Sequence, residues 1–339
     1  MSAFDLAHIL RARRHLQGIV RNTPFDCCDV LTQQTETQIY LKAECLQRTG
    51  SFKLRGAYHK IAALDAEEKG RGIVTASAGN HAQGVGFSVT RFGIPGRIYV
   101  PEIIPKNKLE AIQKYQVDVV IEGHLYDDAH EAALEDARKS GRVFISAFDD
   151  PLIMAGHGTL GLEMLCEVPD LDAVLIPVGG GGLISGVATA LKALNPDIQV
   201  SGCQSVASCA MTRSLEEDTL YTTFPSKETI AEGLEGGISE TTFDLGRRLI
   251  DRMVLVEEDD IRAAIKFLLK YHRWVVEGSG AVGVAALLRG RWAAPGRRAG
   301  VILTGGNLDS VSYTHLRAHE TGLVISSAVL WLKIGGGGG

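Results

Sequence analysis

Lys53 is the residue whose setting in the sequence first suggests chemistry. It lies in the segment Gly50-Ser51-Phe52-Lys53-Leu54-Arg55-Gly56, after a strand-like run at 39–43 and at the start of a helical pattern. The positive end of a helix dipole and the loss of water beside Phe52 and Leu54 both favour the neutral amine, which attacks carbonyl carbons. A surface lysine at a helix start is the commoner case, so the interpretation depends on partners elsewhere in the chain.

A run of four glycines offers a binding site for an anion. The four are Gly179, Gly180, Gly181 and Gly182. They follow a buried-strand run at 173–178 and precede a helical pattern that begins at Leu183. Backbone N–H groups in such a turn converge on an anion, and the helix dipole adds to the attraction. We therefore predict a phosphate-binding turn, with a flexible turn as the alternative. A dinucleotide fingerprint fails, because Ile184 and Ser185 stand where its third glycine would be.

Other polar groups lie near strand ends or helix starts. Ser77-Ala78-Gly79-Asn80-His81 follows the run at 73–76 and offers hydroxyl and backbone donors suited to a carboxylate. A cluster of helix N-caps is an equally good interpretation of that segment. Thr304 follows the last strand-like run and could donate to a heteroaromatic nitrogen or simply form a turn. Glu277 is a loop carboxylate that would face a cleft or cap the next helix.

Short apolar runs alternate with longer helical patterns along most of the chain. Such alternation predicts parallel sheets with helices on both faces, whose ligands collect at the carboxyl ends of the strands. The runs form two series, at 73–76, 97–100, 117–121 and 143–145, and then at 173–178, 254–256 and 301–303. We expect an α/β fold of two lobes, each a mostly parallel sheet flanked by helices. The larger lobe would comprise residues 1–71 and 150–310, and the smaller, inserted lobe residues 72–149.

The composition excludes several classes of function. The formal net charge is -5 and no basic cluster is interleaved with aromatic residues, so nucleic acid is not an expected partner. The first residues lack the features of a secretory signal, and no apolar run is long enough to span a membrane. The six cysteines have no CxxC spacing, which predicts reduced thiols in a cytoplasmic protein. The histidines form no metal-binding pattern, so no metal is expected.

The last residues break the pattern of the preceding chain. Residues 311–339 end in five glycines and resemble translated read-through of a sequencing adapter. We interpret this tail as non-native and give it no functional weight. A genuine C-terminal helix with a glycine tail is the alternative.

Together the motifs resemble the threonine/serine ammonia-lyase (dehydratase) and serine racemase family of fold-type II pyridoxal-phosphate enzymes. The resemblance covers about residues 5–310 and rests on SFKLRGA, SAGNHAQG, GGGGL and TGGN in the family's order and spacing. It implies a two-domain fold-type II architecture, pyridoxal 5'-phosphate as the cofactor and an amino acid as the small-molecule substrate. It also implies a homo-oligomer, either a dimer or a tetramer.

The resemblance gives each candidate residue a role. Lys53 would be the Schiff-base lysine and the base at Cα, with Ser77 as a second catalytic residue. The residues expected to bind the cofactor are Phe52, Lys53, Asn80, Gly179, Gly180, Gly181, Gly182, Leu183, Glu277 and Thr304. The residues expected to bind the substrate carboxylate are Ser77, Gly79, Asn80 and His81.

The chain departs from the family's racemases at two places. Their opposite-face acid is a second serine in the substrate loop, and this chain has Ala78 there, which cannot transfer a proton. Their divalent-metal loop carries two carboxylates, and the matching positions here are Gln204, Ser208 and Ala210. The first departure favours elimination over racemisation, and the second argues against a tightly held divalent metal at that loop.

The resemblance therefore implies an ammonia-lyase that eliminates water from L-threonine or L-serine. The products would be 2-oxobutanoate or pyruvate, with ammonia. A serine racemase, or a dehydratase of another hydroxy-amino acid, is the alternative within the family. A non-catalytic regulatory protein that binds a phosphate-bearing ligand is the alternative from another class.

Overall fold

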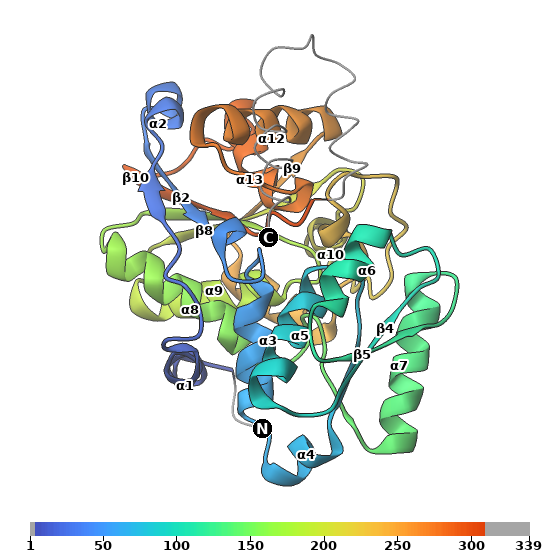
Figure 1. The fold of residues 1–339 in the computed structure, drawn as a ribbon. Helices are drawn as coiled ribbons and strands as arrows, with labels where there is room; N and C mark the ends of the chain where they lie inside the picture. The colour runs from blue at the N-terminus through green and yellow to red at the C-terminus, as the bar shows by residue number, and fades with distance from the viewer. Residues whose placement is uncertain (1–3, 309–339) are drawn as a thin grey trace, which may run out of the picture.

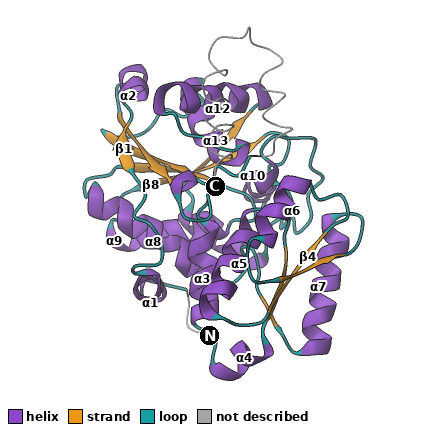
Figure 2. Ribbon diagram, viewed as in Figure 1, coloured by secondary structure: helices purple, strands orange, loops and turns teal. Residues whose placement is uncertain are grey.

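The computed structural model describes residues 4–308 and contains two separate sheets (Figures 1 and 2). The strands are β1 (Phe25–Cys27), β2 (Gln38–Ala43), β3 (Ile73–Ala76), β4 (Gly96–Val100), β5 (Asp118–Ile121), β6 (Val143–Phe144), β7 (Ala173–Pro177), β8 (Gln199–Ser205), β9 (Arg252–Val256) and β10 (Arg298–Leu303). The larger sheet has the order β1-β2-β10-β7-β8-β9, and the smaller has the order β5-β4-β3-β6. The predicted tail lies outside the described residues.

Helices connect the strands and cover the sheets. The α-helices are α1 (Leu6–Leu16), α2 (Asp29–Thr35), α3 (Lys53–Ala62), α4 (Ala66–Arg71), α5 (Asn80–Phe92), α6 (Lys106–Gln113), α7 (Tyr126–Ser140), α8 (Pro151–Glu167), α9 (Gly182–Leu194), α10 (Ala210–Glu217), α11 (Glu240–Leu249), α12 (Glu258–His272) and α13 (Gly278–Leu288). Two short 3-10 helices are η1 (Glu44–Leu46) and η2 (Glu232–Leu234). This arrangement confirms the predicted α/β fold.

The direction of the strands agrees with the predicted parallel sheets, with one exception. β1 runs antiparallel to β2, and every other strand pairing in the described chain is parallel. β1 has only three residues, two of them exposed, so it shows no apolar run by which it could be predicted. The division into lobes at residues 72 and 149 stays a prediction.

The larger sheet is buried on both faces, as a parallel sheet requires. Alternate residues of β7 enter opposite cores: Ala173 and Leu175 pack with α12 and α13, whereas Val174 and Ile176 pack with α8 and α9. All five residues of β7 are buried. Because both faces are apolar, the polar side chains that could do chemistry are displaced to the ends of the strands.

Candidate active site

The predicted site residues gather where strands of both sheets end. Their positions are the first residue of α3 (Lys53), the turn from β3 to α5 (Ser77 to His81), the turn from β7 to α9 (Gly179 to Leu183), the N-cap of α13 (Glu277) and the residue after β10 (Thr304). Segments far apart in the sequence thus meet at the carboxyl ends of parallel strands, where open α/β sheets bind ligands.

Lys53 lies between the parts of the chain that carry the two sheets. Its Nζ donates a hydrogen bond to the backbone carbonyl of Ala147, 2.8 Å away, in the loop after β6. A Cβ atom added at Gly84 of α5 would lie 3.1 Å from the Lys53 backbone, a tight contact, so the glycine favours the close approach of α5. Burial lowers the pKa of Lys53 to about 8, and the nearby Glu277 carboxylate opposes that shift. A substantial fraction of this amine is therefore neutral near physiological pH.

Glu277 and two asparagines form a hydrogen-bonded chain beside the lysine. Asn80 Nδ2 donates to Glu277 Oε1 at 2.6 Å, and Asn307 Nδ2 donates to Asn80 Oδ1 at 2.6 Å. Burial raises the pKa of Glu277 to about 7, while the hydrogen bond from Asn80 acts in the opposite direction. The carboxyl therefore holds a proton in a sizeable fraction of molecules at neutral pH. Asn307 ends the TGGN motif, but no role was predicted for it.

Gly305 lies against these hydrogen-bonded side chains, where a larger residue would collide with them. A Cβ atom there would lie 2.4 Å from Glu277 Oε1 and 3.1 Å from Asn80 Nδ2. Thr304, the residue before it, is buried, and its carbonyl accepts a hydrogen bond from the backbone N–H of Phe52 at 3.1 Å. This bond fixes the end of β10 against the segment that carries Lys53.

The glycine turn is packed rather than loose, which argues against the flexible-turn alternative. Gly181 has φ +92°, in the region that favours glycine, and forms the N-cap of α9. A Cβ atom at Gly180 would lie 2.6 Å from the Phe148 ring, and one at Gly182 would lie 2.6 Å from the Phe148 carbonyl. Among the described residues no side chain caps this helix. Its first N–H groups are therefore available to an anion such as a phosphate.

The Ser77–His81 loop does not act as a cluster of side-chain caps. Gly79 is the N-cap of α5, and within the described chain no side chain caps that helix. Ser77 Oγ accepts a hydrogen bond from Gly79 N at 3.2 Å. His81 is buried, and its Nε2 lies 3.1 Å from the Ile145 carbonyl. Burial and the neighbouring Lys53 lower the pKa of His81 to about 3, so its ring is neutral and already engaged.

Phe52 is buried at the N-cap of α3 and packs edge-on against His157 of α8, with ring centroids 4.7 Å apart. The rings hold the first turn of α3 against α8. Phe52 thereby fixes the backbone from which Lys53 projects.

The positions that match the racemases' metal loop carry hydrogen bonds between neutral groups. Gln204 Oε1 accepts from both the N–H and the hydroxyl of Thr212, each at 2.9 Å. Ser208 Oγ accepts from Ser226 Oγ at 2.8 Å, and Ala210 begins α10. Within residues 4–308 no group of three or more His, Cys, Asp or Glu side chains is arranged to hold a metal ion.

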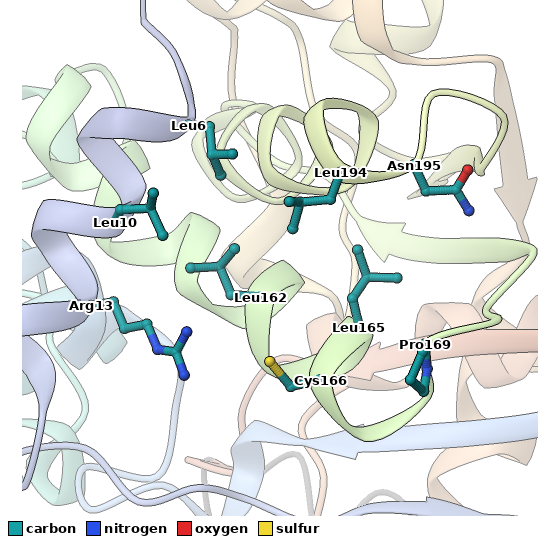
Figure 3. A pocket seen from close by; sticks show the side chains of 9 residues that line it. All are labelled: Leu6, Leu10, Arg13, Leu162, Leu165, Cys166, Pro169, Leu194 and Asn195. Atoms are coloured by element: carbon teal, nitrogen blue, oxygen red, sulfur yellow. The ribbon is translucent and has the colours of Figure 1, made fainter.

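A separate hollow of about 350 Å³ lies between α1, α8 and the end of α9 (Figure 3). Its lining is mostly apolar and includes Leu10, Leu162 and Leu194, with Arg13 at one side. None of the predicted site residues lines it. We therefore assign the chemistry to the strand ends and not to this hollow.

The described cysteines and helices bear on two further predictions. All six cysteines are free, and four of them are buried. None of the helices among residues 4–308 combines the length and the apolar character that crossing a membrane requires.

Comparisons with known proteins agree with this geometry. Residues 16–305 match the family model described as pyridoxal-phosphate dependent enzyme. The chain is 44% identical over 305 residues to an L-threonine ammonia-lyase of Thermotoga maritima, covering 90% of this chain and 76% of that protein. It is 39% identical over 304 residues to a catabolic L-threonine dehydratase of Escherichia coli K12, covering 89% and 92%. The structure of maize serine racemase superposes with a TM-score of 0.88 at 32% identity, covering 94% of this chain and 99% of that one.

Proposed function

The chain belongs to the family of pyridoxal-phosphate-dependent enzymes, and from this premise we propose that it is an ammonia-lyase acting on L-threonine or L-serine. The similar lyases from Thermotoga maritima and Escherichia coli support elimination from L-threonine. The observation that carries the proposal is a buried lysine of lowered pKa that shares one site with an uncapped glycine turn.

The residues present fit pyridoxal phosphate. The glycine turn and the Leu183 N–H would hold the phosphate, because no described side chain caps α9 and its first N–H groups are available to an anion. Glycine is also required by packing at Gly180 and Gly182, where side chains would collide with Phe148. Lys53 would bind the carbonyl carbon covalently, and Asn80, Glu277, Thr304 and Phe52 would surround the ring. When bound, the cofactor supplies an electron sink for the negative charge that develops at Cα.

Lys53 is the residue that we assign to proton transfer. Its neutral amine would take the Cα proton onto Nζ from one face of the substrate. Ser77 and the backbone N–H groups of Gly79, Asn80 and His81 would orient the substrate carboxylate, with the His81 ring left in its structural hydrogen bond. Ala78 has no proton to deliver to the opposite face. This one-sided arrangement disfavours inversion at Cα and favours the competing outcome, in which the β-hydroxyl would leave with a proton as water.

The products formed from L-threonine and L-serine test the proposal. Purified protein supplied with pyridoxal phosphate is expected to convert L-threonine to 2-oxobutanoate and L-serine to pyruvate, each with one equivalent of ammonia. Chiral chromatography of the L-serine reaction should find D-serine at less than about a hundredth of the pyruvate, because Ala78 supplies no second acid. D-serine in amounts similar to pyruvate would favour the serine racemase alternative, which the likeness to the maize enzyme supports.

The lowered pKa of Lys53 leads to a prediction for cofactor capture. With a pKa of about 8, the neutral amine fraction rises about tenfold between pH 7 and pH 9 and then levels off. The rate at which the apoprotein captures pyridoxal phosphate covalently should follow that curve, whereas the rate for free Nα-acetyl-lysine, the control, should keep rising above pH 9. A capture rate that still rises about sevenfold between pH 9 and pH 10 would indicate an ordinary lysine and contradict the assignment.

The proposal extends to the location, assembly, second substrate and lobe boundaries of this protein. We assign the chain to the cytoplasm, where a reducing environment suits its six free cysteines. We also propose a homo-oligomer, serine as a second substrate, and lobe boundaries at residues 72 and 149. The boundaries are supported by the smaller sheet, whose strands run from Ile73 to Phe144.

A further inference from the structure

Beside the candidate site, an ion pair joins the part of the chain that carries the smaller sheet to the part that carries the larger sheet. Lys108 of α6 follows a strand of the smaller sheet, and Glu232 of η2 belongs to the part that carries the larger sheet. Lys108 Nζ lies 2.6 Å from Glu232 Oε2, although the residues are 124 positions apart in the sequence. The two side chains are 22% and 52% exposed, so the pair lies at the surface rather than in the core. Figure 1 shows α6 at the border between the two parts.

The segment that carries Glu232 packs against the glycine turn. A Cβ atom at Gly179 would lie 3.1 Å from the carbonyl of Gly233, the residue after Glu232. Gly233 N in turn donates to Ser279 Oγ at 2.8 Å, at the start of α13 and two residues after Glu277. η2 is therefore held between the turn that fits a phosphate and the helix that carries Glu277.

The helix that carries Lys108 contacts the elements on the other side of the site. α6 packs against α5, the helix that begins with Asn80. The ion pair therefore connects α6, which packs against the helix that begins with Asn80, to η2, which packs against the glycine turn. The fields of both charges also reach Glu277, where Lys108 lowers the pKa and Glu232 raises it.

We propose that the Lys108–Glu232 ion pair is a latch that holds α6 against η2 and keeps the site closed during the reaction. Lys108 and Glu232 are thus positioning residues, and the pair must open for amino acid to enter and for product to leave. A half-exposed ion pair contributes little free energy, so the latch opens readily and weakens in salt. The role in turnover rests on the function proposed above, whereas the closure of α6 on η2 does not.

Hydrogen exchange of the cofactor-loaded protein tests the closure directly. Lys108→Gln and Glu232→Gln should each speed amide exchange in residues 106–113 and 232–234 by about two- to fivefold, and 0.5 M salt should do the same to the parent. Lys108→Glu combined with Glu232→Lys should restore parental exchange. The matched control is Lys106→Gln, because Lys106 is 90% exposed on the same helix and lies 3.9 Å from Glu110. It should exchange like the parent.

Steady-state kinetics then tests the role in turnover. Both single variants should raise KM for L-threonine about two- to fivefold with little change in kcat, and the charge-reversed double variant should recover the parental KM. If the pair acted only through its field at Glu277, the two single variants would change the kinetics in opposite directions, which would overturn the latch. Unchanged exchange in both single variants would also overturn it. A protein without activity on L-threonine would refute the proposed function and leave the exchange result standing.

Discussion

Lys53→Ala should lower the rate of 2-oxobutanoate formation from L-threonine by at least about 10⁴-fold. Losing a residue that both binds the cofactor covalently and moves the Cα proton removes a whole catalytic unit, and such losses commonly reach that size. The fold should survive, because among residues 4–308 the Lys53 side chain makes a single hydrogen bond, to the Ala147 carbonyl, and water can replace it. The measurement is a coupled 2-oxo acid assay at saturating pyridoxal phosphate, with circular dichroism as the check on folding.

Lys53→Arg is the matched control for charge. Arginine keeps a cation at the site but cannot become a neutral nucleophile, because its pKa stays above 12. We expect it to be as inactive as the alanine variant. Activity within about tenfold of the parent in either variant would show that Lys53 is not the base and would refute the mechanism.

Arg55→Met should lower the free energy of unfolding by about 3–5 kcal/mol, because it leaves the fully buried Glu44 carboxylate without its ion-pair partner. Arg55 makes two bonds to Glu44, from Nε at 2.8 Å and from Nη2 at 2.9 Å. It also makes two to Glu163, from Nη1 at 2.6 Å and from Nη2 at 2.9 Å. Arg55 and Glu44 are fully buried. Arg55 lies two residues after Lys53, and its bonds fix α3 to η1 and α8.

The pH dependence of that loss has a definite sign. Burial alone would raise the pKa of Glu44, but Arg55 more than offsets it, so the pKa lies below its usual range. A carboxyl with a lowered folded pKa contributes stability above its unfolded pKa of about 4.5 and loses it as the pH falls. The difference between parent and variant should therefore be largest at neutral pH and shrink as the pH falls below about 4.5.

Urea unfolding of the apoprotein measures this loss. Arg138→Met is the matched control, because its side chain is 68% exposed and pairs with an exposed Glu135 on the same helix. It should change the unfolding free energy by less than about 1 kcal/mol. A loss below about 1 kcal/mol for Arg55→Met would mean that the buried carboxylates find other partners, and would contradict the anchoring role.

Much of the fold could be predicted because its signal is local. The runs of β7 and β10 are apolar and entirely or largely buried, and a glycine turn or a threonine marks where each ends. The elements that escaped prediction lack such a pattern. α2, for example, is a seven-residue helix with one buried residue, Leu31, and β1 has one buried residue of three. Their positions are fixed by tertiary contact, which outweighs their weak intrinsic preference.

The site divides in the same way. Lys53, the glycine turn, Asn80 and Thr304 each follow a strand, so the position of each could be predicted from the sequence. The bonds among Asn80, Glu277 and Asn307 join residues 197 and 227 positions apart, and no local pattern encodes them. Two causes were predicted for a lowered pKa of Lys53, the loss of water and the start of a helix. The structure shows the first of them, because burial is the main cause of the lowered pKa.

Peptide mapping identifies the residue that binds the cofactor covalently, which we propose to be Lys53. The protein is loaded with pyridoxal phosphate, reduced with borohydride, digested and analysed by mass spectrometry. We expect one modified peptide, which spans Lys53 and carries the mass of the reduced cofactor in nearly every molecule. Modification that centres on another lysine, or no modified peptide in protein that turns over L-threonine, would contradict it.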